Sequence, residues 1–202
     1  GGHAALFTSQ HAGSYAPELE LVGVAAAAPA TNLSELFKED RETASGRSLT
    51  SMTVLSWTRV FGIPLVDLVH DHSLHHFEEL AHDCIETLAD FFKLERDEQA
   101  LERKFLKTDP LEHPRLRSIM EENVPDQLPA HIPVFIAQGL EDTLVRPHIT
   151  KEYMDRICSD GVRVKLHVLN SGSHMFAGRD SAYHAVEWMT DRFKGVPAPN
   201  SC

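Results

Sequence analysis

The sequence has little of what two large classes of protein require. Its 202 residues include 19 basic side chains against 30 acidic ones, a formal net charge of −11, and the basic ones are scattered. Nucleic-acid binding needs a concentrated basic surface, so we expect no nucleic-acid partner. The longest apolar run, Val24 to Ala28, is far shorter than the roughly 20 residues of a membrane-spanning helix. We therefore expect no transmembrane segment.

Cysteine is scarce as well. The three residues Cys84, Cys158 and Cys202 are odd in number and form no C-x-x-C pair. Their spacing therefore signals neither a zinc site nor a disulfide framework, and we expect them to act as small buried hydrophobic side chains. The start of the chain lacks the basic and apolar regions of a secretory signal, so the localisation stays unknown.

Helical and buried-strand patterns alternate in what the sequence does contain. Residues 3–12 form an alanine-rich helical pattern that Gly13 is expected to end. The apolar run 20–27 is typical of a strand buried on both faces of a parallel sheet. A second such run, at 134–137, precedes a helix that should begin near Pro147.

The residues after this helix continue the alternation. Apolar and polar side chains alternate from Val162 to Val168, as in an edge strand with one wet face. A final helix should end at Gly195. Its apolar pattern predicts these inward-facing residues: Ala182, Ala185, Val186, Met189 and Phe193. The order of elements predicts an α/β fold with a mostly parallel sheet flanked by helices.

The middle of the chain lacks comparable strand patterns and predicts a helical insertion at 33–130. Within it, the pattern from residue 75 to 93 places apolar side chains at helical spacing: Phe77, Leu80, Ala81, Cys84, Leu88 and Phe91. We therefore divide the chain into a sheet-containing core, residues 1–32 and 131–197, the insertion 33–130, and a tail, 198–202.

Two titratable residues follow the two late strands, where the loops of a parallel sheet converge on a crevice. Asp142 comes after the first, with Glu141 as its adjacent rival, and His174 follows the second in a small-residue loop. Taken alone, each is more often a turn former or helix cap. Their joint placement favours a carboxylate that orients a histidine base.

A nucleophile should precede both residues in the hydrolase order of nucleophile, acid and base. No complete G-x-S-x-G motif occurs, because the stretch 46–50 lacks its second glycine and no strand precedes it. The first five residues, GGHAA, instead fit the small residues that follow a serine on a tight strand-to-helix elbow.

Four stretches, "GGHAALF", "YAPELELVGVAAAAPATNL", "QGLEDTLV" and "SGSHMF", together resemble the α/β-hydrolase superfamily and in particular its secretory lipase and esterase branch. The resemblance implies the carboxyl-terminal half of an α/β-hydrolase with a helical cap, whose serine stands two residues before Gly1. It implies Asp142 and His174 as catalytic acid and base, an ester or lipid substrate and no cofactor, and it is compatible with secretion. With nucleophile and oxyanion-hole donors outside the chain, we expect the 202 residues alone to be hydrolytically inert.

The insertion holds two further features with competing interpretations. His72 and His76 have the i, i+4 spacing of zinc ligands, but no H-E-x-x-H motif accompanies them, so we expect solvated histidines and assign no metal. Aromatic residues either line an acyl pocket beneath a cap or form the core of the insertion: Trp57, Phe61, Phe77, Phe91 and Phe92.

Two other functions stay open. A peptidase of the same fold would carry the same acid and base, and a non-catalytic member of the fold could act as an interaction module. The residue two places before Gly1 separates hydrolase from module, because only the hydrolase needs serine there. A missing elbow strand would also leave the run 20–27 with an unpaired apolar edge.

Overall fold

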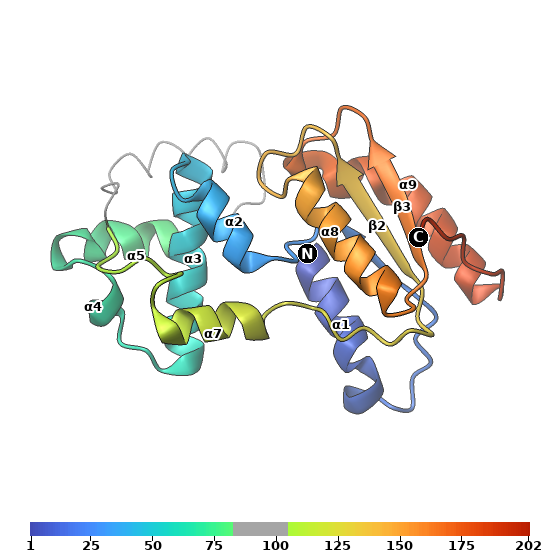
Figure 1. Ribbon diagram of the computed structural model, residues 1–202, viewed down its shortest axis with the longest axis horizontal. Helices are drawn as coiled ribbons and strands as arrows, with labels where there is room; N and C mark the ends of the chain where they lie inside the picture. Colours follow the sequence, from blue (N-terminus) through green and yellow to red (C-terminus); the bar gives the residue numbers. More distant parts are fainter. Residues whose placement is uncertain (83–104) are drawn as a thin grey trace. The chain divides into compact units, whose positions relative to one another are not determined.

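A computed structural model describes residues 1–82 and 105–202 (Figure 1). The chain forms two compact units, which we call the sheet unit, Gly1–Asn32 with Val124–Cys202, and the helical unit, Leu33–Asn123. The sheet unit thus resumes at Val124 rather than at residue 131. The reason is packing, since Leu128 is buried in the core of the sheet unit.

The sheet has three strands in the order β1-β2-β3, and both neighbouring pairs are parallel. The strands are β1, Val24–Ala27; β2, Val134–Gly139; and β3, Val164–Leu169. The predicted α/β fold with a parallel sheet is therefore confirmed. β1 begins at Val24 rather than at Glu20, because its partner strand is preceded by Pro133, which has no N–H to extend the ladder.

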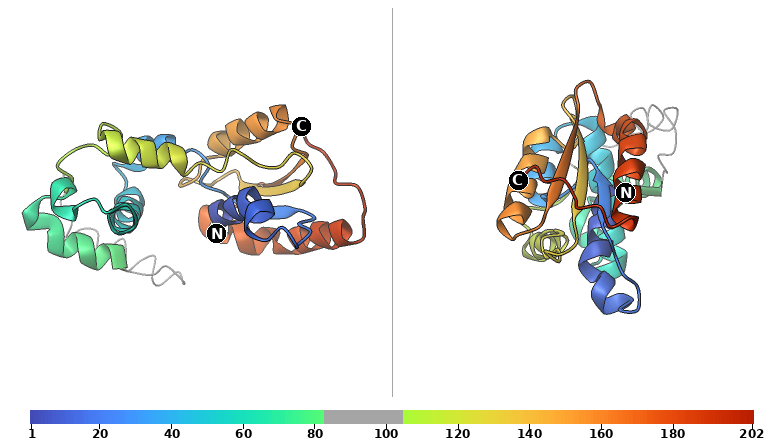
Figure 2. Two further views of the ribbon diagram at one scale, coloured as in Figure 1. Left: turned by 90° about the horizontal axis from the view of Figure 1, so that it is seen from below. Right: turned by 90° about the vertical axis from the view of Figure 1, so that its right-hand side faces the viewer.

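Three helices complete the sheet unit: α1, Gly2–Tyr15; α8, Pro147–Ser159; and α9, His174–Phe193. The side chains of β2 alternate between two cores. Val134 and Ile136 join the core that contains α8, whereas Phe135 and Ala137 join the one that contains Trp188 of α9. The sheet accordingly lies between α8 and α9 (Figure 2).

Two expectations about these helices are wrong. α1 continues through Gly13 to Tyr15, because Gly13 keeps a negative φ and nothing stops the helix there. α9 turns an adjacent face inward: of the predicted residues only Ala185 packs against the core, whereas Val186 and Phe193 are 60% and 78% exposed. Its buried residues are Ala177, Ser181, Trp188 and Arg192. The large indole and the small side chains of this face fit against the sheet better than the aliphatic stripe does.

The cysteine prediction is also wrong. Cys158 in α8 and Cys202 at the chain end form a disulfide, and Cys84 lies outside the described residues. The tail reaches α8 by crossing β3, where the Ser201 N–H donates to the Val164 carbonyl at 2.7 Å. The bridge thus ties both helical layers together across the outer edge of the sheet, a geometry that sequence spacing does not reveal.

The helical unit contains α2, Leu33–Asp40; α3, Ala44–Phe61; α4, Leu65–Leu68; the 3₁₀ turn η1, Asp71–Ser73; α5, Leu74–His82; and α7, Pro114–Glu122. Thr43 caps α3 by accepting a hydrogen bond from the Gly46 N–H, and Gly62 ends it with φ +66°. Of the helical pattern expected from residue 75, Phe77 and Leu80 are buried in α5. Its later positions Cys84, Leu88 and Phe91 lie outside the described residues.

Candidate active site

The carboxylate of Asp142 lies in the turn that follows β2, and its side chain is fully buried. Its Oδ1 accepts hydrogen bonds from the backbone N–H groups of Leu144 and Val145 at 2.9 and 2.8 Å. These two bonds fix the rotation of the carboxylate and leave Oδ2 for another partner. The neighbouring Glu141, the rival candidate from the sequence, is exposed.

His174 is the first residue of α9, directly after the loop that follows β3. Its Nδ1 lies 2.9 Å from Oδ2 of Asp142, and 34% of the His174 side chain is exposed. A donating Nδ1–H leaves Nε2 as the hydrogen-bond acceptor of the neutral ring, which is the tautomer a general base requires. The structure thus brings the two predicted residues together.

The two loops that carry this pair touch through their backbones. The Glu141 N–H donates to the Gly172 carbonyl at 3.2 Å. A Cβ atom placed on Gly139 would lie 2.0 Å from that same carbonyl oxygen. Glycine is therefore required at Gly139 for the loops to approach closely enough for the hydrogen bond between acid and base.

Gln138 is a contributor that sequence reasoning missed. Its side chain is buried, and its Nε2 donates to the carbonyls of Gly139 and Val145, both at 3.0 Å. The same nitrogen lies 3.5 Å from Asp142 Oδ2, and its Oε1 accepts from the Thr150 hydroxyl at 2.6 Å. Gln138 therefore braces the turn that presents the acid. The signal in the sequence was an amide side chain at the end of an otherwise apolar buried strand.

The start of α1 lies at the same edge of the sheet. A Cβ atom on Gly2 would meet the carbonyl oxygen of Ala27, the last residue of β1, at 2.6 Å. Because β1, β2 and β3 are parallel, the carboxyl end of β1 shares an edge with the loops that carry Asp142 and His174. Within the described residues, no hydroxyl or thiol is hydrogen-bonded to Nε2 of His174.

The other predicted features lie in the helical unit. His75 and His76 both pair with Glu79, at 3.5 and 3.4 Å. Among the residues that the structure describes, no group of three or more histidine, cysteine or acidic side chains could hold a metal ion. Across residues 1–82 and 105–202, no helix is both long and apolar enough to cross a membrane.

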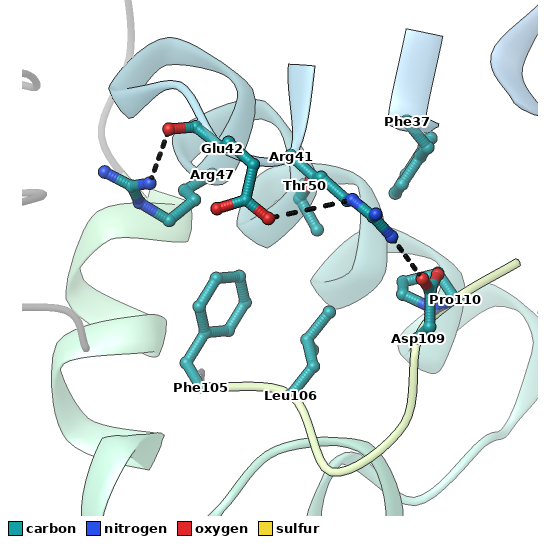
Figure 3. A pocket seen from close by; sticks show the side chains of 9 residues that line it. All are labelled: Phe37, Arg41, Glu42, Arg47, Thr50, Phe105, Leu106, Asp109 and Pro110. Carbon is teal, nitrogen blue, oxygen red and sulfur yellow. Dashed lines mark hydrogen bonds and ion pairs between the residues drawn. The ribbon is translucent and has the colours of Figure 1, made fainter. Parts of the chain in front are cut away.

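A cavity of about 300 Å³ opens in the helical unit (Figure 3). Arg41 crosses its wall, with its guanidinium 2.8 Å from Asp109 and 3.7 Å from Glu42, and Phe37 and Phe105 line it. Of the aromatic residues proposed for an acyl pocket, the three that the structure describes, Trp57, Phe61 and Phe77, do not line this cavity.

Those aromatic residues instead support the alternative of a core internal to the insertion. Trp57 and Phe77 lie in the buried core of the helical unit, and Phe61 packs against that core. Phe91 and Phe92 fall outside the described residues. Each described member of the set is therefore engaged in packing within its own unit.

Comparison with known proteins agrees with this arrangement. The model of the family described as secretory lipase matches residues 1–201. Lipase A of Arthroderma benhamiae is 22% identical over 204 aligned positions, which cover 100% of this chain and 43% of that protein.

Two crystal structures of Candida antarctica lipase A also cover this whole chain. The first is 16% identical with a TM-score of 0.74; the second, in a closed state, is 15% identical with a TM-score of 0.68. The chain covers 48% and 49% of those two structures. It thus spans less than half the length of the relatives it matches, and the likeness to the structures is one of fold.

Proposed function

Because this chain belongs to the secretory lipase family, we propose that it supplies the acid and base of a serine-dependent carboxylic ester hydrolase acting on lipid or other acyl esters. The observation that carries the proposal is the 2.9 Å hydrogen bond between Asp142 and His174 at the carboxyl edge of the parallel sheet. That edge also holds the start of α1, where the resemblance implies the end of a nucleophile elbow.

In the proposed reaction, Nε2 of His174 accepts the proton of a serine hydroxyl as the serine oxygen attacks the ester carbonyl. The buried carboxylate of Asp142 stabilises the resulting imidazolium through Nδ1. His174 then returns the proton to the departing alcohol oxygen as the carbon–oxygen bond breaks. Water repeats the cycle on the acyl-enzyme, with the same histidine as base, and no cofactor takes part.

We further propose that the serine and the oxyanion-hole donors belong to residues outside this stretch of 202, so that the 202-residue chain alone does not turn over esters. When the nucleophile of a characterised triad is removed, the enzyme still accelerates the reaction about 10³- to 10⁴-fold over the uncatalysed rate. The oxyanion hole contributes to that residual acceleration. The cap role of the insertion, residues 33–130, is proposed on family resemblance.

The test compares this chain with a longer form that includes the residues upstream of Gly1. We expect the longer form to hydrolyse p-nitrophenyl esters and the His174→Ala variant of that form to lose this activity. The Asp142→Asn variant should have a kcat lower by about 10⁴-fold. The matched control is Glu141→Gln, which changes the exposed neighbour of the acid and should leave kcat unchanged.

Three results would contradict the proposals. Preference of the longer form for aminoacyl anilides over esters would assign a peptidase of the same fold. A residue other than serine two places before Gly1 would assign an interaction module. Ester turnover by the 202-residue chain that disappears in His174→Ala would refute its inertness.

A further inference from the structure

Two histidines lie against each other beside the outer strand of the sheet unit. His167 is on β3 and His184 on α9, and their ring centres are 4.4 Å apart with the ring planes inclined by 42°. Within residues 1–82 and 105–202, neither imidazole forms a hydrogen bond or an ion pair. His184 is exposed and His167 partly exposed, so a solute in water can reach both rings.

The pair lies where α9 leaves part of the sheet uncovered. Alternation along β3 turns Val164 and Leu166 toward the core that contains α8, so Lys165 and His167 face the side of α9. The hydrophobic core beneath α9 takes its strand residues from β1 and β2. A cavity of about 280 Å³ therefore opens between β3 and one flank of α9, and both histidines line it.

Charged side chains surround the two imidazoles in this cavity. Glu187 and Asp191 follow His184 by three and seven residues, which places all three on one flank of α9, and all three line the cavity. Lys165 adds an ammonium from β3. The two carboxylates outweigh this ammonium, so the local charge favours a cation.

The spacing of the rings fits one shared metal ion. Two imidazoles that bind an ion through nitrogen at about 2.0–2.1 Å hold their ring centres roughly 4.5–5 Å apart, close to the 4.4 Å between His167 and His184. Imidazole suits copper, nickel and zinc, and Cu²⁺ binds most tightly among the divalent ions of this series. No third histidine, cysteine or acidic side chain joins the pair in a ligand group among the described residues, so water has to complete the coordination.

We propose that His167 and His184 form a binding site for a divalent transition-metal ion, with Cu²⁺ bound most tightly. One nitrogen of each ring binds the ion, which thereby links the outer strand of the sheet to the last helix. His184 follows His174 by ten residues on α9, a rise of about 15 Å. The metal site is therefore separate from the acid–base pair and does not depend on the proposed hydrolase function.

The test is titration of the metal-free 202-residue chain with Cu²⁺, followed by Trp188 fluorescence in a Trp57→Phe background. Trp188 lines the same cavity, so Cu²⁺ bound there should quench its emission. We expect saturable quenching at one ion per chain. EDTA should restore the emission, which separates reversible binding from oxidation of the protein.

Two variants and one control assign the quenching to the histidine pair. His167→Gln and His184→Gln should each weaken Cu²⁺ binding at least about tenfold, because only one imidazole remains. The matched control is His131→Gln, which removes an exposed histidine of the same unit that lines a different cavity, and it should bind Cu²⁺ like the parent. Urea unfolding of the metal-free variants, followed by Trp188, establishes that they are folded.

Electron paramagnetic resonance of the Cu²⁺ complex gives a direct readout of the ligands. The parent should show two coordinated imidazole nitrogens, and each histidine variant should show one. Absence of saturable quenching in the parent, undiminished binding in both histidine variants, or a single coordinated imidazole in the parent would each overturn the proposal. Equal weakening of Cu²⁺ binding in His131→Gln would overturn it as well.

Discussion

Replacing both Cys158 and Cys202 by serine should destabilise the sheet unit and leave the helical unit unaffected. The disulfide closes a loop with a sequence separation of 44 residues, which contains the whole of β3 and α9. Without the bridge, the unfolded chain regains the freedom that this loop removes. Both cysteines are replaced together so that no single thiol remains to exchange with Cys84.

The magnitude follows from the loop length. The chain-entropy relation, −2.1 − 1.5R ln n, gives about 4 kcal/mol at 25 °C for a loop of this size. The tail contacts point in the same direction, because the bonds from Ser201 to Val164 and from Leu166 to Ser201 hold the tail against β3. Their loss would expose the edge of that strand.

The two tryptophans allow the unfolding of each unit to be measured separately. Trp188 lies in the sheet unit and Trp57 in the helical unit, and the chain contains no others. Urea unfolding in a Trp57→Phe background therefore reports the sheet unit, and Trp188→Phe reports the helical unit. With a slope of roughly 2–3 kcal/mol per molar urea, the midpoint of the sheet unit should fall by roughly 1.3–2 M.

The reasoning fails if the sheet unit loses less than about 1 kcal/mol, or if both reporters shift equally. Reduced parent protein provides the internal control, because it lacks the bridge but keeps both cysteine side chains. It should reproduce the midpoint of the double variant.

Three further outcomes are expected. Gly139→Ala should separate the two loops of the site and abolish the low-field NMR signal of the His174 Nδ1 proton. Gly178→Ala should preserve that signal, because a Cβ atom on Gly178 meets no other atom within 4 Å. Tyr153→Phe should cost about 1 kcal/mol at pH 7 by urea unfolding. Burial raises the pKa of Tyr153, so the parent should lose stability above about pH 10 as the unfolded phenol ionises, and the variant should not. Burial is the main cause, and two nearby basic side chains a further one, of a lowered pKa of His167. The unfolded chain therefore binds a proton at this residue more readily than the folded one, and the free energy of unfolding should fall as the pH drops below about 6.5. His167→Gln should reduce this pH dependence.

The sheet and the acid–base pair were accessible from the sequence because local signals and topology agree there. The buried run from Val134 predicts β2, Pro147 marks the first residue of α8, and Gly161 follows its end with φ +86°. Parallel pairing then requires the loops that contain Asp142 and His174 to leave the same edge. No other long-range information was needed to bring the two side chains together.

The inward face of α9, the disulfide and the role of Gln138 escaped prediction for one physical reason, because each depends on contacts between distant segments. A helical apolar stripe identifies the apolar face of α9, but packing of Trp188 against Phe135 decides which face meets the sheet. The disulfide depends on a tail that crosses an edge strand. Gln138 acts through Thr150, which lies a loop away on α8.

The register of the sheet explains why the acid and base meet as they do. β2 and β3 end level, with Gly139 opposite Leu169, so both loops leave the sheet at the same height. A slip of one residue would turn the side chains of one strand to the other face and move its loop by one residue spacing. The register is specified by the two cores on either side of the sheet, which means that packing remote from the site determines the distance between Asp142 and His174. Substitutions that shift β3 should therefore impair the pair without touching either residue.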